Sequence, residues 1–134
     1  MSKLTHLTAP TLDDFEVLAR EEYRRLPQEF RDKCGEIIFR VQDYADDDVL
    51  DAMDASAFEI TGLFVGQELG AQDANPMPRE PSMIFLYRVP IIAEWAETGI
   101  ELGHLIYHVI VHEIGHHFGL SDEDMDRIEG DHHH

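Results

Sequence analysis

Apolar residues recur at helical spacing near the start of the chain. Through "LDDFEVLAREEY" they are three or four residues apart, and Thr11 followed by Asp14 fits the capping box that begins many helices. The pattern predicts a helix from about Leu12 to Arg25. It ends before Pro27 because proline disfavours helical backbone in the residue before it. A short helical turn is expected to follow over residues 27–33.

Three later stretches are rich in β-branched and aromatic residues, which is typical of strands. They predict strands from Glu36 to about Gln42, near Leu63–Val65, and at Met83–Arg88. Residues 70–81 lie between the second and third of these, contain three of the six prolines and show no periodicity. Because proline cannot continue a helix or a central strand, this segment is predicted to be a loop.

The acidic segment "ADDDVLDAMDAS", residues 45–56, has the composition of a calcium-binding loop. The glycine and the final glutamate that such a loop requires are absent at the necessary offsets, so calcium is not expected. Aspartates are favourable at the positive end of a helix. The segment therefore predicts a short helix with Val49, Leu50 and Met53 facing the core.

The last third of the chain predicts three helices. Pro90 begins the first, which runs through Trp95 and is broken around Gly99. The second covers Ile100–Phe118 and is apolar around its circumference, so we expect it to be buried on nearly all sides. A final helix is expected to run through Ile128. At 134 residues the chain is expected to be a single domain, 1–134.

Charge narrows the classes of function. The chain has 10 Lys and Arg against 28 Asp and Glu, a formal net charge of −18. Nucleic acids and anionic membrane surfaces would repel such a protein, so neither is an expected partner. Cations and basic, unfolded or neutral peptides are compatible with it. Most of the acidic residues need no explanation beyond solubility.

The cysteine content and the two ends of the sequence are relevant to the cellular compartment of the protein. Cys34 is the only cysteine, so no intramolecular disulfide is expected, and we expect this thiol to be a small buried group. The first residues lack the apolar stretch of a secretion signal, and no segment approaches the ~20 apolar residues that span a bilayer. We therefore expect a cytoplasmic protein. The terminal "DHHH", residues 131–134, is expected to be a purification tag or a disordered tail.

One turn of the long apolar helix carries residues that suit a metal. His112 and His116 are four residues apart, which places both imidazoles on one helix face, about 6 Å apart along the axis. Two imidazoles at that spacing can share one Zn²⁺. Glu113 is rotated by about 100° from His112, beside the metal, where it can act as a general base toward a water molecule. This HExxH arrangement predicts a catalytic zinc site with Glu113 as the base.

Catalytic zinc usually has three protein ligands, so one more must come from elsewhere in the chain. Gly119 suits the end of the helix, and Asp122 follows three residues later, which completes the pattern HExxHxxGxxD. We predict Asp122 as the third ligand, with Asp126 and Glu129 as alternatives. The acids here also suit the first turn of the last helix with Ser121 as its N-cap, an explanation that needs no metal.

Three other histidines lie on the same helix. His104 and His108 continue the four-residue spacing back from the motif, and we expect both to be hydrogen-bonded residues of the core or its boundary. His117 points about 100° away from His116 and is expected to be structural. A serine hydrolase is not indicated, because the sequence has no GxSxG-type elbow.

The stretches "HEIGHHFGLSDEDM", "GLFVG" and "PSMIFLYRVPI" resemble the family of small bacterial zincin-like predicted metallopeptidases, over about residues 60–129. The resemblance implies an α+β fold, a minimal zincin in which a small mixed sheet packs against the central HExxH helix. It also implies that His112 and His116 are zinc ligands, that Glu113 is the base, and that Asp122 is the third ligand.

The resemblance also indicates where substrate would bind. In zincins generally, substrate lies extended along an edge strand beside the metal. We expect that strand to be the one from Met83 to Arg88, with Met83, Phe85 and Tyr87 as candidate substrate-binding positions.

The function expected from the sequence is zinc-dependent hydrolysis of peptide bonds in short peptides or unfolded proteins. One alternative is a non-catalytic zinc- or peptide-binding module that retains a zincin core, and another is a hydrolase of a different amide. Glu113 favours an enzyme, because a purely structural zinc needs no base and would be closed by a fourth ligand.

Overall fold

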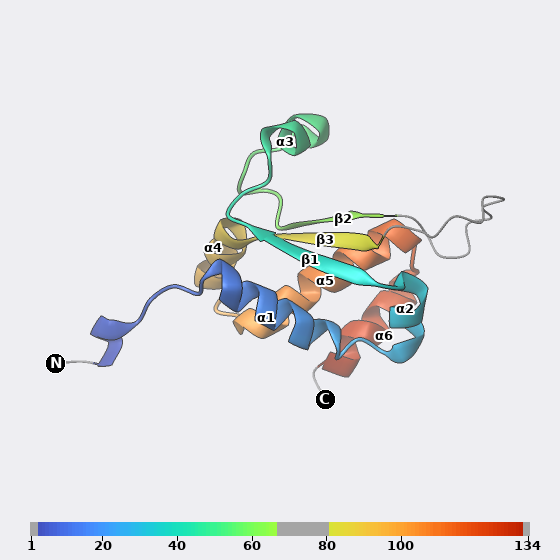
Figure 1. The fold of residues 1–134 in the computed structure, drawn as a ribbon. Coiled ribbons are helices and arrows are strands. Elements are labelled where there is room, and N and C mark those ends of the chain that lie inside the picture. The colour runs from blue at the N-terminus through green and yellow to red at the C-terminus, as the bar shows by residue number, and fades with distance from the viewer. Residues whose placement is uncertain (1–2, 67–80, 133–134) are drawn as a thin grey trace.

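The computed structural model describes residues 3–66 and 81–132, in which helices pack on both faces of a three-stranded sheet (Figure 1). A short 3₁₀ helix at Lys3–His6 precedes the folded body. The elements then follow in the order α1 Leu12–Tyr23, α2 Gln28–Cys34, β1 Ile37–Gln42, α3 Asp47–Met53, β2 Gly62–Val65, β3 Ser82–Tyr87, α4 Arg88–Thr98, α5 Leu102–Phe118 and α6 Asp122–His132. This is the α+β class that the sequence predicts. The predicted loop at residues 70–81 lies almost wholly outside the described residues.

The first helix begins as predicted. The Thr11 hydroxyl accepts a hydrogen bond from the Asp14 backbone N–H at 3.1 Å, and the Asp14 carboxylate accepts one from the Thr11 N–H at 2.8 Å, which is a capping box. The helix ends at Tyr23, before the expected Arg25. Here the N–H of Leu26 bonds back to the Tyr23 carbonyl, three residues earlier, which tightens the turn before α2.

The sheet has the order β1-β3-β2, with β1 parallel and β2 antiparallel to β3. The expectation that Met83, Phe85 and Tyr87 lie on an edge strand is wrong, because β3 is the central strand and pairs along both sides. Its backbone hydrogen-bonding groups are used on one side by β1 and on the other by β2, so β3 has no free side for an added strand. β1 and β2 form the two edges of the described sheet.

The junction between β3 and α4 has no loop. Arg88 was expected to end the strand and Pro90 to begin the helix, but the strand ends at Tyr87 and the helix begins at Arg88. The Arg88 guanidinium donates to the Asp43 carboxylate at 2.7 Å and to the Pro10 carbonyl at 3.0 Å, which fixes this corner. Pro90 then lies in the first turn, where a helix needs no backbone N–H.

Helix α3 lies above one end of the sheet, on the side opposite α5 (Figure 1). Val49 and Leu50 pack as predicted, against a small cluster that includes Ile60 and Tyr87. Met53 does not face the core, since its side chain is 52% exposed. Met53 is the last residue of the helix, and Asp54 after it has left-handed backbone with φ of 49°.

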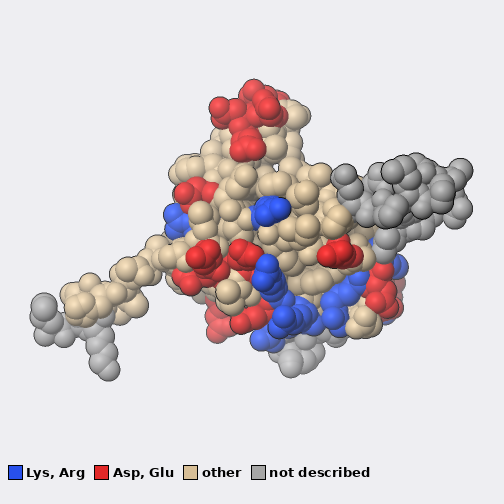
Figure 2. Space-filling view, in the orientation of Figure 1, with Lys and Arg blue, Asp and Glu red and all other residues tan. Residues whose placement is uncertain are grey.

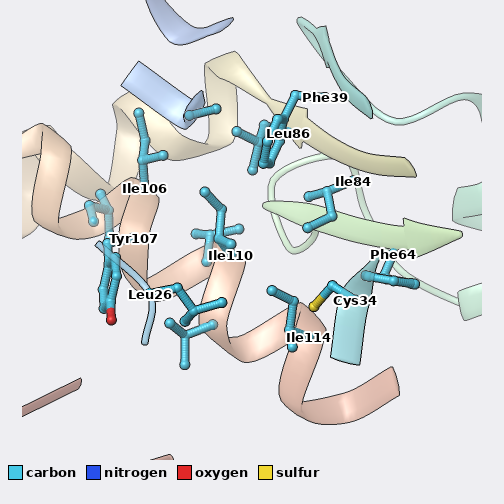
Figure 3. Packing of buried hydrophobic residues seen from close by; sticks show 14 of the residues in the cluster. Leu26, Cys34, Phe39, Phe64, Ile84, Leu86, Ile106, Tyr107, Ile110 and Ile114 are labelled. Carbon is cyan, nitrogen blue, oxygen red and sulfur yellow. The ribbon is translucent and has the colours of Figure 1, made fainter. Parts of the chain in front are cut away.

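The main core lies between the sheet and the pair α1 and α5. Ile84 and Leu86 of β3 meet Ile106, Ile110 and Ile114 of α5 there, and all are fully or almost fully buried (Figure 3). Cys34 is 2% exposed in this cluster, which confirms the prediction of a buried thiol. No helix in the described parts of the chain is long and apolar enough to span a membrane.

The C-terminal helix is longer than expected. It was predicted through Ile128, and α6 instead continues to His132. Ile128 is fully buried, and its backbone carbonyl accepts a hydrogen bond from the buried Tyr107 hydroxyl at 2.9 Å. These contacts hold α6 against α5, which is the arrangement that forms the candidate site.

Candidate metal centre

Helix α5 is buried on most of its circumference, as its composition predicts, but one stripe faces solvent. The stripe consists of His108, His112 and His116, and most of the other residues from Leu105 to Gly115 are buried. The helix ends at Gly119, whose φ of 63° lies in the left-handed region that glycine adopts without strain. This residue turns the chain back so that α6 begins three residues later.

The two histidines of the motif lie against each other. The ring centroids of His112 and His116 are 4.1 Å apart, with an angle of 56° between the ring planes. Partial burial, followed by the effects of His116 and His108, lowers the pKa of His112. Its imidazole is therefore neutral at pH 7, which is the form that can bind a metal.

The histidine pair forms one wall of an open cleft of about 500 Å³ between α5 and α6. The opposite wall is formed by Leu120 and the first turn of α6, where Asp122 and Asp126 line the cleft. Two imidazoles and a carboxylate are donors that zinc accepts, so these residues fit the ion by their chemistry and by sharing one cleft. Across residues 3–66 and 81–132, however, no three His, Cys, Asp or Glu side chains are gathered closely enough to hold a metal.

The alternatives for the third ligand differ in their contacts. Glu129 accepts a hydrogen bond from His108 Nδ1 at 2.7 Å, whereas Asp126 lies in the cleft with Asp122. The capping role expected of Ser121 is confirmed, because its hydroxyl accepts a hydrogen bond from the Asp124 N–H at 3.0 Å. Since the hydroxyl caps the helix, that role does not use the Asp122 carboxylate.

Glu113 lies on the side of α5 that faces the sheet. Its Oε1 accepts a hydrogen bond from the Phe64 backbone N–H of β2 at 3.2 Å. Burial raises the pKa of Glu113, while the nearby His116 and the Phe64 hydrogen bond act in the opposite direction. A half-buried carboxyl with a raised pKa is suited to accept a proton and release it again.

The remaining histidines have identifiable contacts. His108 is hydrogen-bonded as expected, but its side chain is 55% exposed, so it does not belong to the core. Its pKa is raised by the hydrogen bond to Glu129, against the effect of burial. The His117 ring stacks on Phe64 with a centroid distance of 4.1 Å, and His104 is half-buried.

Three residues at the site were not found from the sequence. Met125 lies against Gly115, the residue between the two histidines, and a side chain at Gly115 would overlap the Met125 sulfur. Gly62 and Phe64 of β2 approach Glu113 from the sheet. The glycines in "GLFVG" indicate that another element approaches this strand closely. Which element it is depends on the order of strands in the sheet, and the sequence does not give that order.

Comparison with known protein families identifies a family to which the chain is similar. The sequence model of a family described as zincin-like metallopeptidase matches residues 34–132, about three quarters of the chain. No curated protein matches the sequence. The matched segment contains β1 to β3 and the whole of α3 to α6, and therefore every residue of the cleft described above.

Proposed function

The chain belongs to the family of zincin-like metallopeptidases, and on that premise we propose that it hydrolyses peptide bonds with zinc held by His112, His116 and Asp122. The observation that carries the proposal is the position of Glu113. A half-buried carboxyl, hydrogen-bonded to the Phe64 backbone of the sheet, lies next to a solvent-facing pair of histidines that line an open cleft. Burying a carboxyl group costs free energy, so packing of the fold alone gives no reason for Glu113 at this position.

Each residue then has a distinct role. His112 and His116 supply the imidazole nitrogens, and Asp122 supplies the carboxylate oxygen from the facing helix. When bound, zinc supplies Lewis-acid chemistry, which polarises a scissile carbonyl and acidifies water. Glu113 accepts a proton from the attacking water as its oxygen adds to the carbonyl carbon. The same carboxyl then donates that proton to the amine nitrogen as the C–N bond breaks.

The corrected sheet order moves the expected substrate strand to β2. No strand in the described part of the chain pairs with the outer side of β2, and this edge is the one beside Glu113. An extended peptide can add to such an edge through its backbone, which suits short or unfolded substrates. The negative charge of the chain is compatible with neutral or basic peptides.

A non-catalytic zinc- or peptide-binding module is the second candidate. The observation that favours it is that Asp122 shares the cleft with the histidines without joining them in a three-residue cluster within the described chain. Such a module would bind metal or peptide and would not depend on Glu113 as a base.

Hydrolysis of a peptide library by the zinc-loaded protein separates the two candidates. The three terminal histidines, residues 132–134, are replaced by alanine so that they bind no metal. We expect cleavage products in mass spectra of the parent, and a rate lower by roughly 10²–10⁴ for Glu113→Gln with zinc still bound. Glu123→Gln, at an exposed position outside the cleft, is the matched control and keeps full activity.

Two results of this assay would count against the proposed peptidase. Equal hydrolysis by the parent and Glu113→Gln would contradict the assigned base. Zinc binding without any hydrolysis would favour the non-catalytic module.

A further inference from the structure

The register of β2 determines which of its backbone groups face outward. The N–H of Tyr87 donates to the carbonyl of Thr61 at 3.0 Å, so this pair is hydrogen-bonded across β2 and β3. In an antiparallel pair such positions alternate. With Leu63 opposite Phe85 and Phe64 opposite Ile84, the backbone groups of Leu63 face β3, and those of Phe64 face the free edge.

The outward N–H of Phe64 is the one that donates to Glu113. The carboxylate oxygen is 3.2 Å from this nitrogen and so occupies a donor of the free edge. A peptide that adds to β2 as a further strand needs the same donor for one of its own carbonyl oxygens. The candidate base and a bound peptide backbone therefore require one and the same N–H.

The strand cannot easily move to resolve this competition. The Phe64 side chain is only 9% exposed, and its ring is stacked on His117 and packed edge-on against Phe118. A side chain at Gly62 would lie 2.7 Å from Val109 Cγ1, so β2 is already as close to α5 as a glycine allows. The mobile partner is the Glu113 side chain.

We propose that a peptide pairing with β2 displaces the Glu113 carboxylate from the Phe64 N–H, so that substrate binding itself frees the base for its reaction with water. Phe64 is thus a positioning residue that acts through its backbone. The inference rests on the proposed function, in which β2 receives the substrate. Without peptide, one oxygen of Glu113 is held by the strand. With peptide, a substrate carbonyl takes over that hydrogen bond and the carboxylate turns toward the water it deprotonates.

Amide hydrogen exchange of the metal-free full-length protein, followed by NMR, tests the contact directly. Glu113→Gln keeps a side-chain oxygen that can accept from Phe64, whereas Glu113→Ala removes the acceptor. We expect the Phe64 amide to exchange about tenfold faster in Glu113→Ala than in Glu113→Gln. The amides of Leu63 and Val65 face β3 and serve as internal controls for opening of the strand, so their exchange is expected to be equal in both variants.

Peptide binding tests the competition. The probe is an acetylated, amidated hexapeptide of alternating threonine and valine, which is extended and uncharged. We expect it to bind Glu113→Ala about tenfold more tightly than Glu113→Gln, and to restore slow exchange at Phe64.

Two results would overturn the proposal. One is equal exchange of the Phe64 amide in both variants, which would mean that Glu113 does not occupy this donor. The other is a peptide that leaves Phe64 exchange in Glu113→Ala unchanged at every concentration, which would mean that β2 does not receive a strand. Neither measurement involves zinc or turnover, so failure of the proposed catalysis is detected separately by the hydrolysis assay.

Discussion

Gly115 leaves room for a side chain of the facing helix at the site. It lies in α5 between His112 and His116, and a methyl group there would overlap the Met125 sulfur of α6. Overpacking costs typically 1–3 kcal/mol, and the better helix propensity of alanine returns about 1 kcal/mol. We expect Gly115→Ala to lower the free energy of unfolding by about 1 kcal/mol, measured by urea denaturation of the metal-free protein.

The matched control is Gly130→Ala in α6. A side chain at Gly130 meets no other atom, so this substitution is expected to leave stability unchanged or to raise it by up to about 1 kcal/mol. If Gly115→Ala were as stable as Gly130→Ala, the Met125 side chain would not restrict the space at Gly115.

His108 and Glu129 give the fold a pH-dependent contact between α5 and α6. The pKa of His108 is raised above 6.5 by the hydrogen bond to Glu129, against the effect of burial, and Glu129 and Glu94 raise it further through their charges. The stabilisation is therefore fully present below the unfolded pKa and is lost as pH rises through the folded pKa.

Urea denaturation of the parent and of Glu129→Gln at about pH 5.5 and about pH 9 tests this direction of the pH dependence of stability. We expect the parent to be more stable than the variant at the lower pH, with the difference disappearing at the higher pH. A difference that grew with pH would contradict the assigned ion pair. Because His108 is more than half exposed, the effect is small at high salt.

At the scale of elements, the turn between α5 and α6 brings the second wall of the cleft into place. Gly119 has φ of 63°, and a side chain at this position would meet no other atom. The position therefore favours glycine because of its backbone conformation and not because of a lack of space. Left-handed backbone costs other residues roughly 1–2 kcal/mol, and asparagine least. We expect Gly119→Ala to lower the free energy of unfolding by about 1 kcal/mol and Gly119→Asn by less. Equal losses would indicate that the turn is not held in this conformation.

The sequence predicts single elements better than their pairing. The capping box at Thr11, the long apolar helix and its end at Gly119 follow from residues close together in the chain, and the structure contains all three. The place of β3 at the centre of the sheet depends on contacts with residues more than 40 positions away. Hydrophobic strand composition alone does not fix that order, and the edge was therefore assigned to the wrong strand.

The same distinction applies to the site. The spacing of His112 and His116 is a property of one helix, so their proximity could be predicted from the motif. The contact between Glu113 and the Phe64 N–H joins residues 49 positions apart, and the packing of Met125 on Gly115 depends on the angle between two helices. Neither contact has a local pattern in the sequence.

At the scale of the whole molecule, charge is unevenly distributed. Residues 41–66, which include α3 and β2, contain seven Asp and Glu and no Lys or Arg. Acidic side chains cover α3, while basic side chains gather over α1 and α2, as Figure 2 shows. The basic residues of α1, α2 and the turn between them are Arg20, Arg24, Arg25, Arg31 and Lys33. The chain segment that includes the proposed substrate edge is thus acidic as a whole.

This distribution favours cationic substrates through long-range attraction. We expect kcat/KM for a lysine-containing peptide to exceed that for its glutamate-containing counterpart at about 0.02 M salt, and the ratio to fall toward one at about 0.5 M salt. Kinetics of the two peptides at both salt concentrations measure the effect. If the ratio did not depend on salt, any preference would come from direct contacts with the peptide and not from long-range attraction.

The central claim is that one zinc ion binds between α5 and α6, and elemental analysis of the protein after gel filtration tests it most directly. With residues 132–134 replaced by alanine, we expect about one zinc per chain. His112→Ala is expected to lose the metal, Asp122→Ala to bind it more weakly, and Asp126→Ala to retain it. Absence of zinc from the parent after incubation with excess metal at neutral pH, or its full retention in His112→Ala, would contradict the claim.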